Sequence, residues 1–163
     1  MNFQNYNRDI VIATALVGTE PTIMLTGPAP ATQAALEKAG MTPEDIDHVN
    51  AHATSTPEGD KSELQAIRTI FGDDVTRISI TANKSMLGHT LGAAGAIEAA
   101  ISILTIRDGC VPPTINLEDP DPNGEGLDLV PNVAKRQDVR TVLSNSFGFG
   151  GQNTALILTR WVA

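Results

Sequence analysis

The 163-residue chain carries 11 lysine and arginine residues against 19 aspartate and glutamate residues, which gives a formal net charge of −8 at pH 7. This acidic balance argues against a nucleic-acid surface, because phosphate binding requires a basic face. Hydrophobic residues make up 41% of the chain and charged residues 18%, which is typical of a globular protein with a buried core. We therefore expect residues 1–163 to form one domain.

The chain lacks the sequence signals of export and of membrane insertion. Residues 1–9 are polar and contain no apolar segment of a signal peptide. The long apolar run, residues 92–106, contains Glu98 and is shorter than the ~20 residues of a membrane span. The single cysteine, Cys110, excludes an internal disulfide and a thiolate metal cluster. These features predict a cytoplasmic protein without membrane contact.

Apolar runs and helical spacing predict three strand–helix units followed by a hairpin. Gly40 is well placed to end the first helix. Strands that alternate with helices imply a mixed, largely parallel sheet covered by helices. The proline-rich residues 110–139 are expected to be irregular, with one short strand at 127–130. The other strands are predicted at 10–17, 46–51, 77–81, 139–146 and 154–160, and the helices at 31–39, from Pro57 or Gly59 onward, and at 92–106.

The third helix, residues 92–106, has almost no polar face. Glu98 is its only charged residue, and small residues occupy most of its first half. A helix that faces water on one side normally shows a polar stripe. We therefore expect this helix to be buried nearly all round, and to need cover from several neighbours.

The first polar cluster follows the second predicted strand, where His52 precedes the hydroxyls of Thr54 and Thr56. Ligands of open α/β sheets usually bind at the C-terminal ends of strands. The alternative is a turn rich in serine and threonine that caps the next helix. His48 and His52 do not suggest a metal site, because four residues along a strand separate them by roughly 13 Å. No third strong ligand lies nearby in the sequence.

The second cluster contains Lys84 and His89, just before the apolar helix. A cation there meets the positive end of the helix dipole, so Lys84 suggests a buried partner or an anionic ligand. The alternative is a lysine that points to solvent. The helix start favours a neutral His89, whose Nε2–H can donate to a developing oxyanion.

The third cluster is the glycine-rich segment 145–153, which contains Phe147 and Phe149. Its glycines permit a tight backbone path. The two aromatic rings either line an apolar channel or are core residues of a plain hairpin. Cys110 has no adjacent histidine in the sequence and is interpreted as a small buried hydrophobe rather than a nucleophile.

Together, residues 45–60, 82–100, 107–122 and 144–153 strongly resemble the C-terminal half of the β-ketoacyl-acyl-carrier-protein synthases of the thiolase superfamily. The resemblance implies a βαβαβαββ half with a mixed five-stranded sheet and helices on both faces. It implies a transferase that catalyses decarboxylative Claisen condensation of an acyl thioester with malonyl-acyl-carrier protein, in fatty acid or polyketide synthesis. The helix at 92–106 resembles the one that lies between the two halves of such enzymes.

The resemblance also implies catalytic roles. His52 and His89 are similar to the two active-site histidines, which act on the malonyl thioester and stabilise the enolate. Lys84 is similar to the lysine of that site, and Glu63 to the acidic residue near the lysine.

The remaining motif residues resemble groups that bind the substrate. Thr54 and Thr56 are similar to hydroxyls that hold the phosphopantetheine arm of acyl-carrier protein or CoA, and no other cofactor is implied. Phe147 resembles the gating phenylalanine beside the acyl pocket, where Phe149 is also expected. The glycine-rich loop that helps to shape the oxyanion region contains Asn145, Gly148 and Gly150.

Two departures from the family pattern affect the expected activity. The nucleophilic cysteine of the family lies in the N-terminal half, which these residues do not include, so we expect no condensing activity from this chain alone. Residues 17–41 look more like a thiolase. The chain is then expected to form a homodimer or to bind a complementing N-terminal half. The alternative is a non-catalytic assembly module or an engineered hybrid that dimerises to mimic the complete fold.

Overall fold

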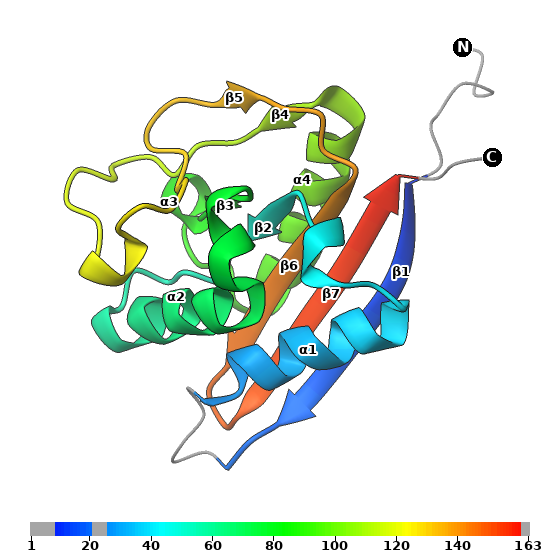
Figure 1. Cartoon of the computed structure of the whole chain (residues 1–163). Coiled ribbons are helices and arrows are strands. Elements are labelled where there is room, and N and C mark those ends of the chain that lie inside the picture. Colours follow the sequence, from blue (N-terminus) through cyan, green and yellow to red (C-terminus); the bar gives the residue numbers. More distant parts are fainter. Residues whose placement is uncertain (1–8, 21–25, 161–163) are drawn as a thin grey trace.

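A five-stranded sheet lies between two layers of helices in the computed structural model, which describes residues 9–20 and 26–160 (Figure 1). The strand order is β1-β7-β6-β2-β3. The order of elements along the chain confirms the predicted strand–helix units and the final hairpin. The strands are β1 (Asp9–Gly18), β2 (His48–Asn50), β3 (Ser79–Thr81), β6 (Thr141–Gly148) and β7 (Gln152–Arg160).

The sheet is mixed, as predicted, but it is not largely parallel. Strand β2 pairs in parallel with both β3 and β6, over three residues on each side. The β6–β7 hairpin is antiparallel over its whole length, and β1 adds to β7 as an antiparallel edge strand. The longer pairings are therefore antiparallel, because the hairpin and its neighbour contain the long strands.

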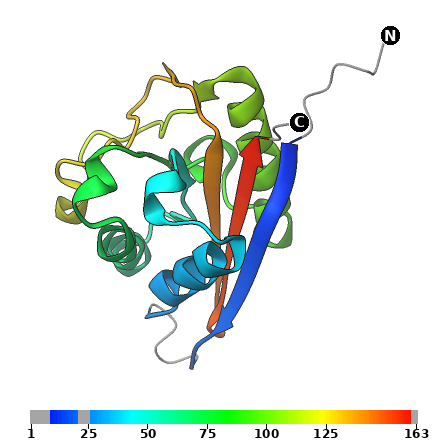
Figure 2. The same cartoon turned by 45° about the vertical axis from the view of Figure 1, so that its right-hand side comes forward.

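Helices cover both faces of the sheet, which confirms the expected layers. Helices α1 (Pro28–Ala39) and α2 (Pro57–Phe71) pack on one face, and α4 (Ala94–Asp108) packs on the other, as the edge-on view in Figure 2 shows. Side chains alternate between the two faces. Leu143 and Ile157 join the core under α1 and α2, whereas the adjacent Val142 and Leu158 join the core under α4.

The predicted ends of the helices have clear local causes. Proline residues open both α1 and α2, where a missing N–H costs no helical hydrogen bond. Gly40 ends α1 with φ of 65°, a left-handed conformation that glycine adopts readily. A short helix, α3 (Lys84–Leu87), precedes α4. Single 3-10 turns lie at Pro43–Asp45, Gly72–Thr76, Leu91–Ala93 and Pro122–Gly124.

The long connection from α4 to β6 contains a separate two-stranded sheet, β4 (Cys110–Val111) with β5 (Lys135–Arg136). The strand predicted at 127–130 is reduced to one parallel bridge between Asp128 and Ser79. Val130 has φ of 48°, outside the extended region, and Pro131 follows it. A proline cannot donate to a strand ladder, and Pro131 forms only an isolated parallel bridge with Thr114. The ion pair between Asp128 and Lys135 holds this connection together.

Helix α4 is not buried nearly all round within this chain. Several of its polar side chains lie on the buried face, while apolar side chains lie on the exposed face. Its buried face contains Glu98, Ser102 and Thr105. The Nδ2 of Asn50, on β2, donates to the Glu98 carbonyl and to the Ser102 hydroxyl, both at 3.1 Å. The outward face is apolar and uncovered here, with Ile97 37% and Leu104 43% exposed.

Some expectations fall outside the described residues, namely those for the polar N-terminal residues 1–8 and for residues 21–25 of the thiolase-like stretch. Within 9–20 and 26–160, no helix combines the length and the apolar character that crossing a bilayer requires.

The buried His48 makes the stability of the fold dependent on pH. Burial is the main cause that lowers the pKa of His48 from 6.5 to about 3, and the Lys135 charge adds to it. Between these values the unfolded chain binds a proton that the folded chain does not, so the free energy of unfolding falls as pH falls below 6.5. This histidine contributes up to about 1.4 kcal/mol per pH unit.

Urea unfolding at pH 7, 6 and 5 measures this dependence. We expect a shallower loss of stability with acidification in His48→Gln, whose amide can still bond the Thr81 hydroxyl that His48 contacts at 2.8 Å. Comparing the two chains cancels the titration of every other group. Equal slopes would contradict the assignment to His48.

Candidate active site

A cleft of about 830 Å³ opens between the loop after β2, the segment that leads into α4, and the β6–β7 hairpin. It brings together side chains from three motifs that are far apart in the sequence. The predicted site residues on its walls are His52, Thr54, Thr56, Glu63, His89, Phe147, Gly148 and Phe149.

The two cleft histidines lie in direct ring contact. The ring centroids of His52 and His89 are 5.5 Å apart, with the planes at 87°. The ring of Phe147 packs against His52 from another side, at 5.6 Å and 62°. His52 is half-buried and His89 is exposed. The cleft therefore holds two imidazoles beside one aromatic wall.

The surroundings of His52 favour its neutral form. Burial is the main cause that lowers the pKa of His52 to about 4, and the charges of Lys84 and His89 add to it. At neutral pH this ring is therefore uncharged.

The backbone fixes the orientation of the second histidine. The Leu91 N–H donates to Nδ1 of His89 at 3.2 Å. A neutral His89 ring then carries its proton on Nε2. This matches the donor role that the sequence suggested for His89.

Lys84 has a buried partner, and that partner is Glu98. Lys84 is 8% exposed, and its Nζ lies 2.5 Å from Oε1 of Glu98. The interpretation of Lys84 as a solvent-facing lysine is therefore wrong. Burial raises the pKa of the Glu98 carboxyl, and the Lys84 ammonium opposes this effect. Glu98 was missed as a site residue, although a lone charge in an apolar helix was the signal that could have identified it.

Glu63 does not pair with the lysine; it accepts hydrogen bonds from the loop that carries His52. Its carboxylate accepts the N–H groups of His52 and Ala53 at 2.9 and 2.8 Å, and the Nδ2 of Asn145 at 3.3 Å. Burial raises the pKa of Glu63, and these bonds act in the opposite direction. Asn145 therefore links β6 to the His52 loop.

The two threonines face the cleft and do not cap α2 with their side chains. The hydroxyls of Thr54 and Thr56 lie 3.1 Å apart. Thr56 is the N-cap residue of α2 but makes no side-chain capping bond. A side chain at Gly59 would place its Cβ 2.4 Å from the Thr56 hydroxyl, so glycine is required there for this arrangement.

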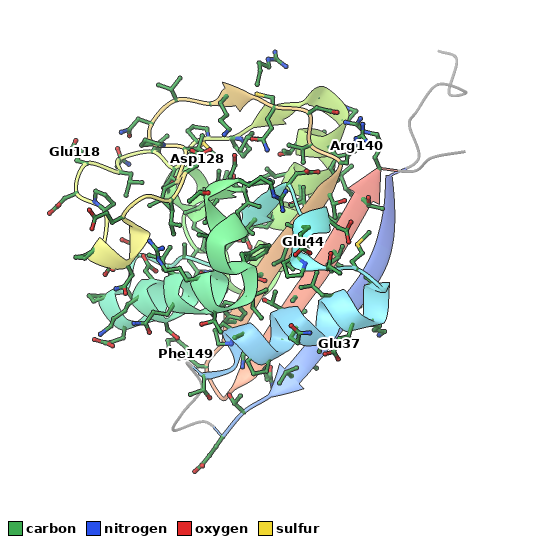
Figure 3. The ribbon with its side chains drawn as sticks, in the orientation of Figure 1. Glu37, Glu44, Glu118, Asp128, Arg140 and Phe149 are labelled. Carbon is green, nitrogen blue, oxygen red and sulfur yellow. The ribbon has the colours of Figure 1, made fainter. Side chains whose placement is uncertain are left out.

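The two phenylalanines of the glycine-rich hairpin differ in burial. Phe147 is half-buried, whereas Phe149 is 93% exposed at the tip of the hairpin, so the hairpin does not have two core aromatics (Figure 3). Gly150 and Gly151 have φ of 93° and 81°. A Cβ at Gly151 would lie 2.0 Å from the Thr19 carbonyl oxygen, so the turn closes only with glycine.

Cys110 and His48 lie away from the cleft. Cys110 begins β4 beyond the C-terminal end of α4, a 15-residue helix about 22 Å long. His89 lies before the other end of that helix. His48 is fully buried in β2, between β6 and β3 in the sheet. Among the described residues, no group of three or more histidine, cysteine or acidic side chains is arranged to hold a metal ion.

Over residues 17–118 the chain matches the family described as "Beta-ketoacyl synthase, C-terminal domain". This match includes residues 17–41, the stretch that looked more like a thiolase. A protein of Coxiella burnetii (strain RSA 493 / Nine Mile phase I), 3-oxoacyl-[acyl-carrier-protein] synthase 2, is 54% identical over 125 residues, which are 77% of this chain and 30% of that protein.

Two solved structures share the fold. One is described as "The ishigamide ketosynthase/chain length factor", with a TM-score of 0.86 and 41% identity over 93% of this chain and 38% of that one. The other is a type II PKS acyl-carrier protein in complex with its ketosynthase bound to the hexaketide, with a TM-score of 0.85 and 32% identity over 93% and 38%. The chain spans about a third of the length of the curated relatives it matches.

The buried ion pair predicts a strong energetic coupling between Lys84 and Glu98. Removal of one partner leaves an unpaired buried charge, which costs about 3–5 kcal/mol. We expect Lys84→Met and Glu98→Gln each to lose stability of this order in urea unfolding, and the double variant to lose much less than the sum.

The matched control is the exposed pair of Arg140 with Asp138, at 3.6 Å. Arg140→Met should cost far less, because solvent screens an exposed pair. Additive losses in the Lys84 and Glu98 double variant would show that the pair is not coupled.

Proposed function

Because the chain belongs to the β-ketoacyl synthase family, as its C-terminal domain, we propose that it supplies the histidine and lysine part of the active site of a condensing enzyme. The reaction joins an acyl thioester to a malonyl thioester with loss of carbon dioxide. The observation that supports this most directly is the contact of His52 with His89 at one wall of a cleft large enough for a thioester arm.

In the proposed reaction, the two imidazoles stabilise the charge that forms on the malonyl thioester oxygen. The bond between the malonyl carboxylate and its α-carbon breaks, carbon dioxide leaves, and the electron pair forms an enolate. Neutral Nε2–H groups of His52 and His89 donate to the enolate oxygen. The enolate carbon then attacks the acyl thioester carbonyl, and the carbon–sulfur bond breaks with its electron pair passing to sulfur. By family resemblance, that sulfur belongs to a cysteine outside these 163 residues.

We propose that Lys84 acts through charge and position. Its ammonium is held by Glu98. Burial is the main cause that lowers the pKa of His52, and the positive charge of Lys84 adds to it, so the ring stays a hydrogen-bond donor without net charge. This role explains why a lysine is buried beside a helix start, where the dipole opposes it.

The substrate arm is proposed to be the phosphopantetheine of acyl-carrier protein or CoA. Thr54 and Thr56 present hydroxyls on the cleft wall, where they can bond the amides of such an arm. The printed description of one structural relative, a ketosynthase in complex with an acyl-carrier protein, supports a carrier-protein partner.

The two phenylalanines are proposed to have different roles at the acyl pocket. Phe147 forms a fixed wall, because it packs on His52. Phe149 also lines the cleft but is exposed at the hairpin tip. Its freedom from packing makes Phe149, rather than Phe147, the better candidate for a moving gate.

The uncovered face of α4 is proposed to pack against the rest of the synthase. The matched relatives are about three times as long as the segment they share with this chain, so they contain enough further chain to cover it. The alternative of a non-catalytic module finds less support, because such a module has no use for converging neutral histidines.

A chimera tests the proposed chemistry. The matched segment of the Coxiella burnetii synthase is replaced by this chain, and condensation of acyl-carrier-protein and malonyl-carrier-protein substrates is measured. We expect activity in the chimera and none in the 163-residue chain alone. His52→Ala and His89→Ala should each lower kcat by about 10²–10³, the usual effect of losing an oxyanion donor.

The control for this experiment is Lys61→Ala, a change of an exposed residue on α2 that should leave the rate unchanged. An inactive chimera, or full activity in both histidine variants, would refute the proposed function.

The uncovered helix face also predicts self-association of the chain in isolation. Without its complement, the apolar face that includes Ile97 and Leu104 should drive assembly at micromolar concentration, because exposed apolar patches mark interaction sites. Sedimentation should show smaller species for the pair of changes Ile97→Lys and Leu104→Lys. Val133→Lys, at an exposed apolar residue outside α4, is the control. A chain that is monomeric before any substitution would contradict the proposed interface.

A further inference from the structure

The loop that carries His52 contains backbone strain directly beside the histidine. Ala53 has φ of 28° and Ser55 has φ of 62°. The left-handed region is costly for residues with a Cβ atom, and glycine is the residue that adopts it freely. Strain of this kind persists only where surrounding interactions hold it in place.

Two carboxylates of α2 hold this loop through its backbone. Glu63 accepts the His52 N–H on one oxygen and the Ala53 N–H on the other, at 2.9 and 2.8 Å. Asp60, three residues earlier on the same helix, accepts the Ser55 N–H at 3.1 Å. The backbone N–H groups of Thr54 and Thr56 also bond Asp60. Burial raises the pKa of Asp60, and these backbone bonds oppose that effect.

The N–H groups of residues 52–56 therefore turn toward α2. Successive N–H groups converge on one anion when the backbone alternates between right- and left-handed conformations. Here the anions are the protein's own side chains. The bonds of Glu63 fix the peptide planes before the Ala53 Cα atom, and the bond of the Thr54 N–H to Asp60 fixes the plane that follows it. The positive φ of Ala53 is the turn between these planes. With the backbone turned inward, the His52 ring faces His89 and Phe147.

We infer that Glu63 is a positioning residue for His52, and that its paired hydrogen bonds, together with those of Asp60, hold Ala53 in a strained left-handed conformation that a glycine would adopt without strain. This inference rests on the proposed function in one respect, which is that His52 is there a catalytic residue. The hydrogen bonds of Glu63 to the His52 loop, called the clamp below, are present in the isolated chain.

The test compares Glu63→Gln, Ala53→Gly and the double variant in the 163-residue chain, with Glu37→Gln as the control. Glu37 lies on the surface of α1, where it bonds only the exposed Gln33 among the described residues (Figure 3). The readouts are the Tm and the NMR signals of the isotope-labelled histidine rings over a pH titration.

We expect Ala53→Gly to raise the Tm, by about 2–4 °C for a strain of the usual size, and to leave the His52 signals in place. Glu63→Gln puts an amide N–H where one backbone N–H needs an acceptor. It should lower the Tm, displace the His52 ring signals and raise the pH at which His52 titrates. The loss of Tm should be smaller in the Ala53→Gly background, because less strain then depends on the clamp. Glu37→Gln should change none of these.

Unmoved His52 signals in Glu63→Gln would overturn the positioning role. Displaced His52 signals or a lowered Tm in Ala53→Gly would refute the claim that Ala53 is strained. If Glu63→Gln alone does not fold, recovery of a folded chain in the double variant supports the inference, and failure of both to fold refutes the coupling.

An activity measurement separates this inference from the proposed function. In the chimera, Glu63→Gln should lower kcat on the order of 10²-fold, as small misplacements of catalytic groups do, with KM nearly unchanged. Displaced NMR signals together with an inactive parent chimera would leave the clamp intact and refute only the proposed chemistry.

Discussion

The buried ion pair between Lys84 and Glu98 is the constraint on which the arrangement of this domain depends. Two opposite charges buried away from water remain together, because removing one of them leaves an unpaired buried charge at a high cost in free energy. The pair joins the segment before α4 to the inward face of α4 itself. It therefore fixes the rotation of that helix about its axis, and with it the segment that carries His89.

Once this rotation is fixed, the polarity of α4 follows. Glu98 faces the sheet, so Ser102 and Thr105 on the same side also turn inward, and Asn50 of β2 bonds the backbone and hydroxyl there. The apolar side chains of Ile97 and Leu104 are left on the outside, whereas Ile106 stays in the core beneath the helix. In an isolated globular domain this would be a defect, but it is consistent with a family whose members are much longer than this chain. The Lys84–Glu98 ion pair thus accounts both for the charge beside the cleft and for the apolar face of α4 that needs a covering surface.

The sequence predicted the elements that depend on local signals. Gly40, the proline that opens α2, and the glycine-rich hairpin each act through their own backbone preferences. Helix α1, however, begins at Pro28, three residues before its predicted start at Ala31. The meeting of His52 with His89 was predicted by family resemblance, since spacing alone could not bring two distant loops together. The sequence suggested a buried partner or an anionic ligand for Lys84 but did not identify Glu98, because spacing does not show which way the helix of Glu98 faces. The sequence predicted that α4 needs cover from several neighbours, and its exposed apolar face agrees with this. How much of the helix this chain itself covers could not be predicted, because an apolar pattern reports hydrophobicity and does not report what covers it. The short parallel strands and the bridge at Asp128 depend on tertiary pairing, which local periodicity does not encode.

Strand β6 runs from the centre of the fold to its rim, and this has a consequence for how the protein can diversify. Leu143 is fully buried, Asn145 is tied to the loop of His52, and Phe149 stands almost entirely in solvent. Replacement at the outer end therefore disturbs little packing, whereas replacement at the inner end disturbs the whole sheet. Natural variation in sequence can accumulate at the hairpin tip while the packed and hydrogen-bonded strand behind it stays constant, so that one scaffold can carry many different rims.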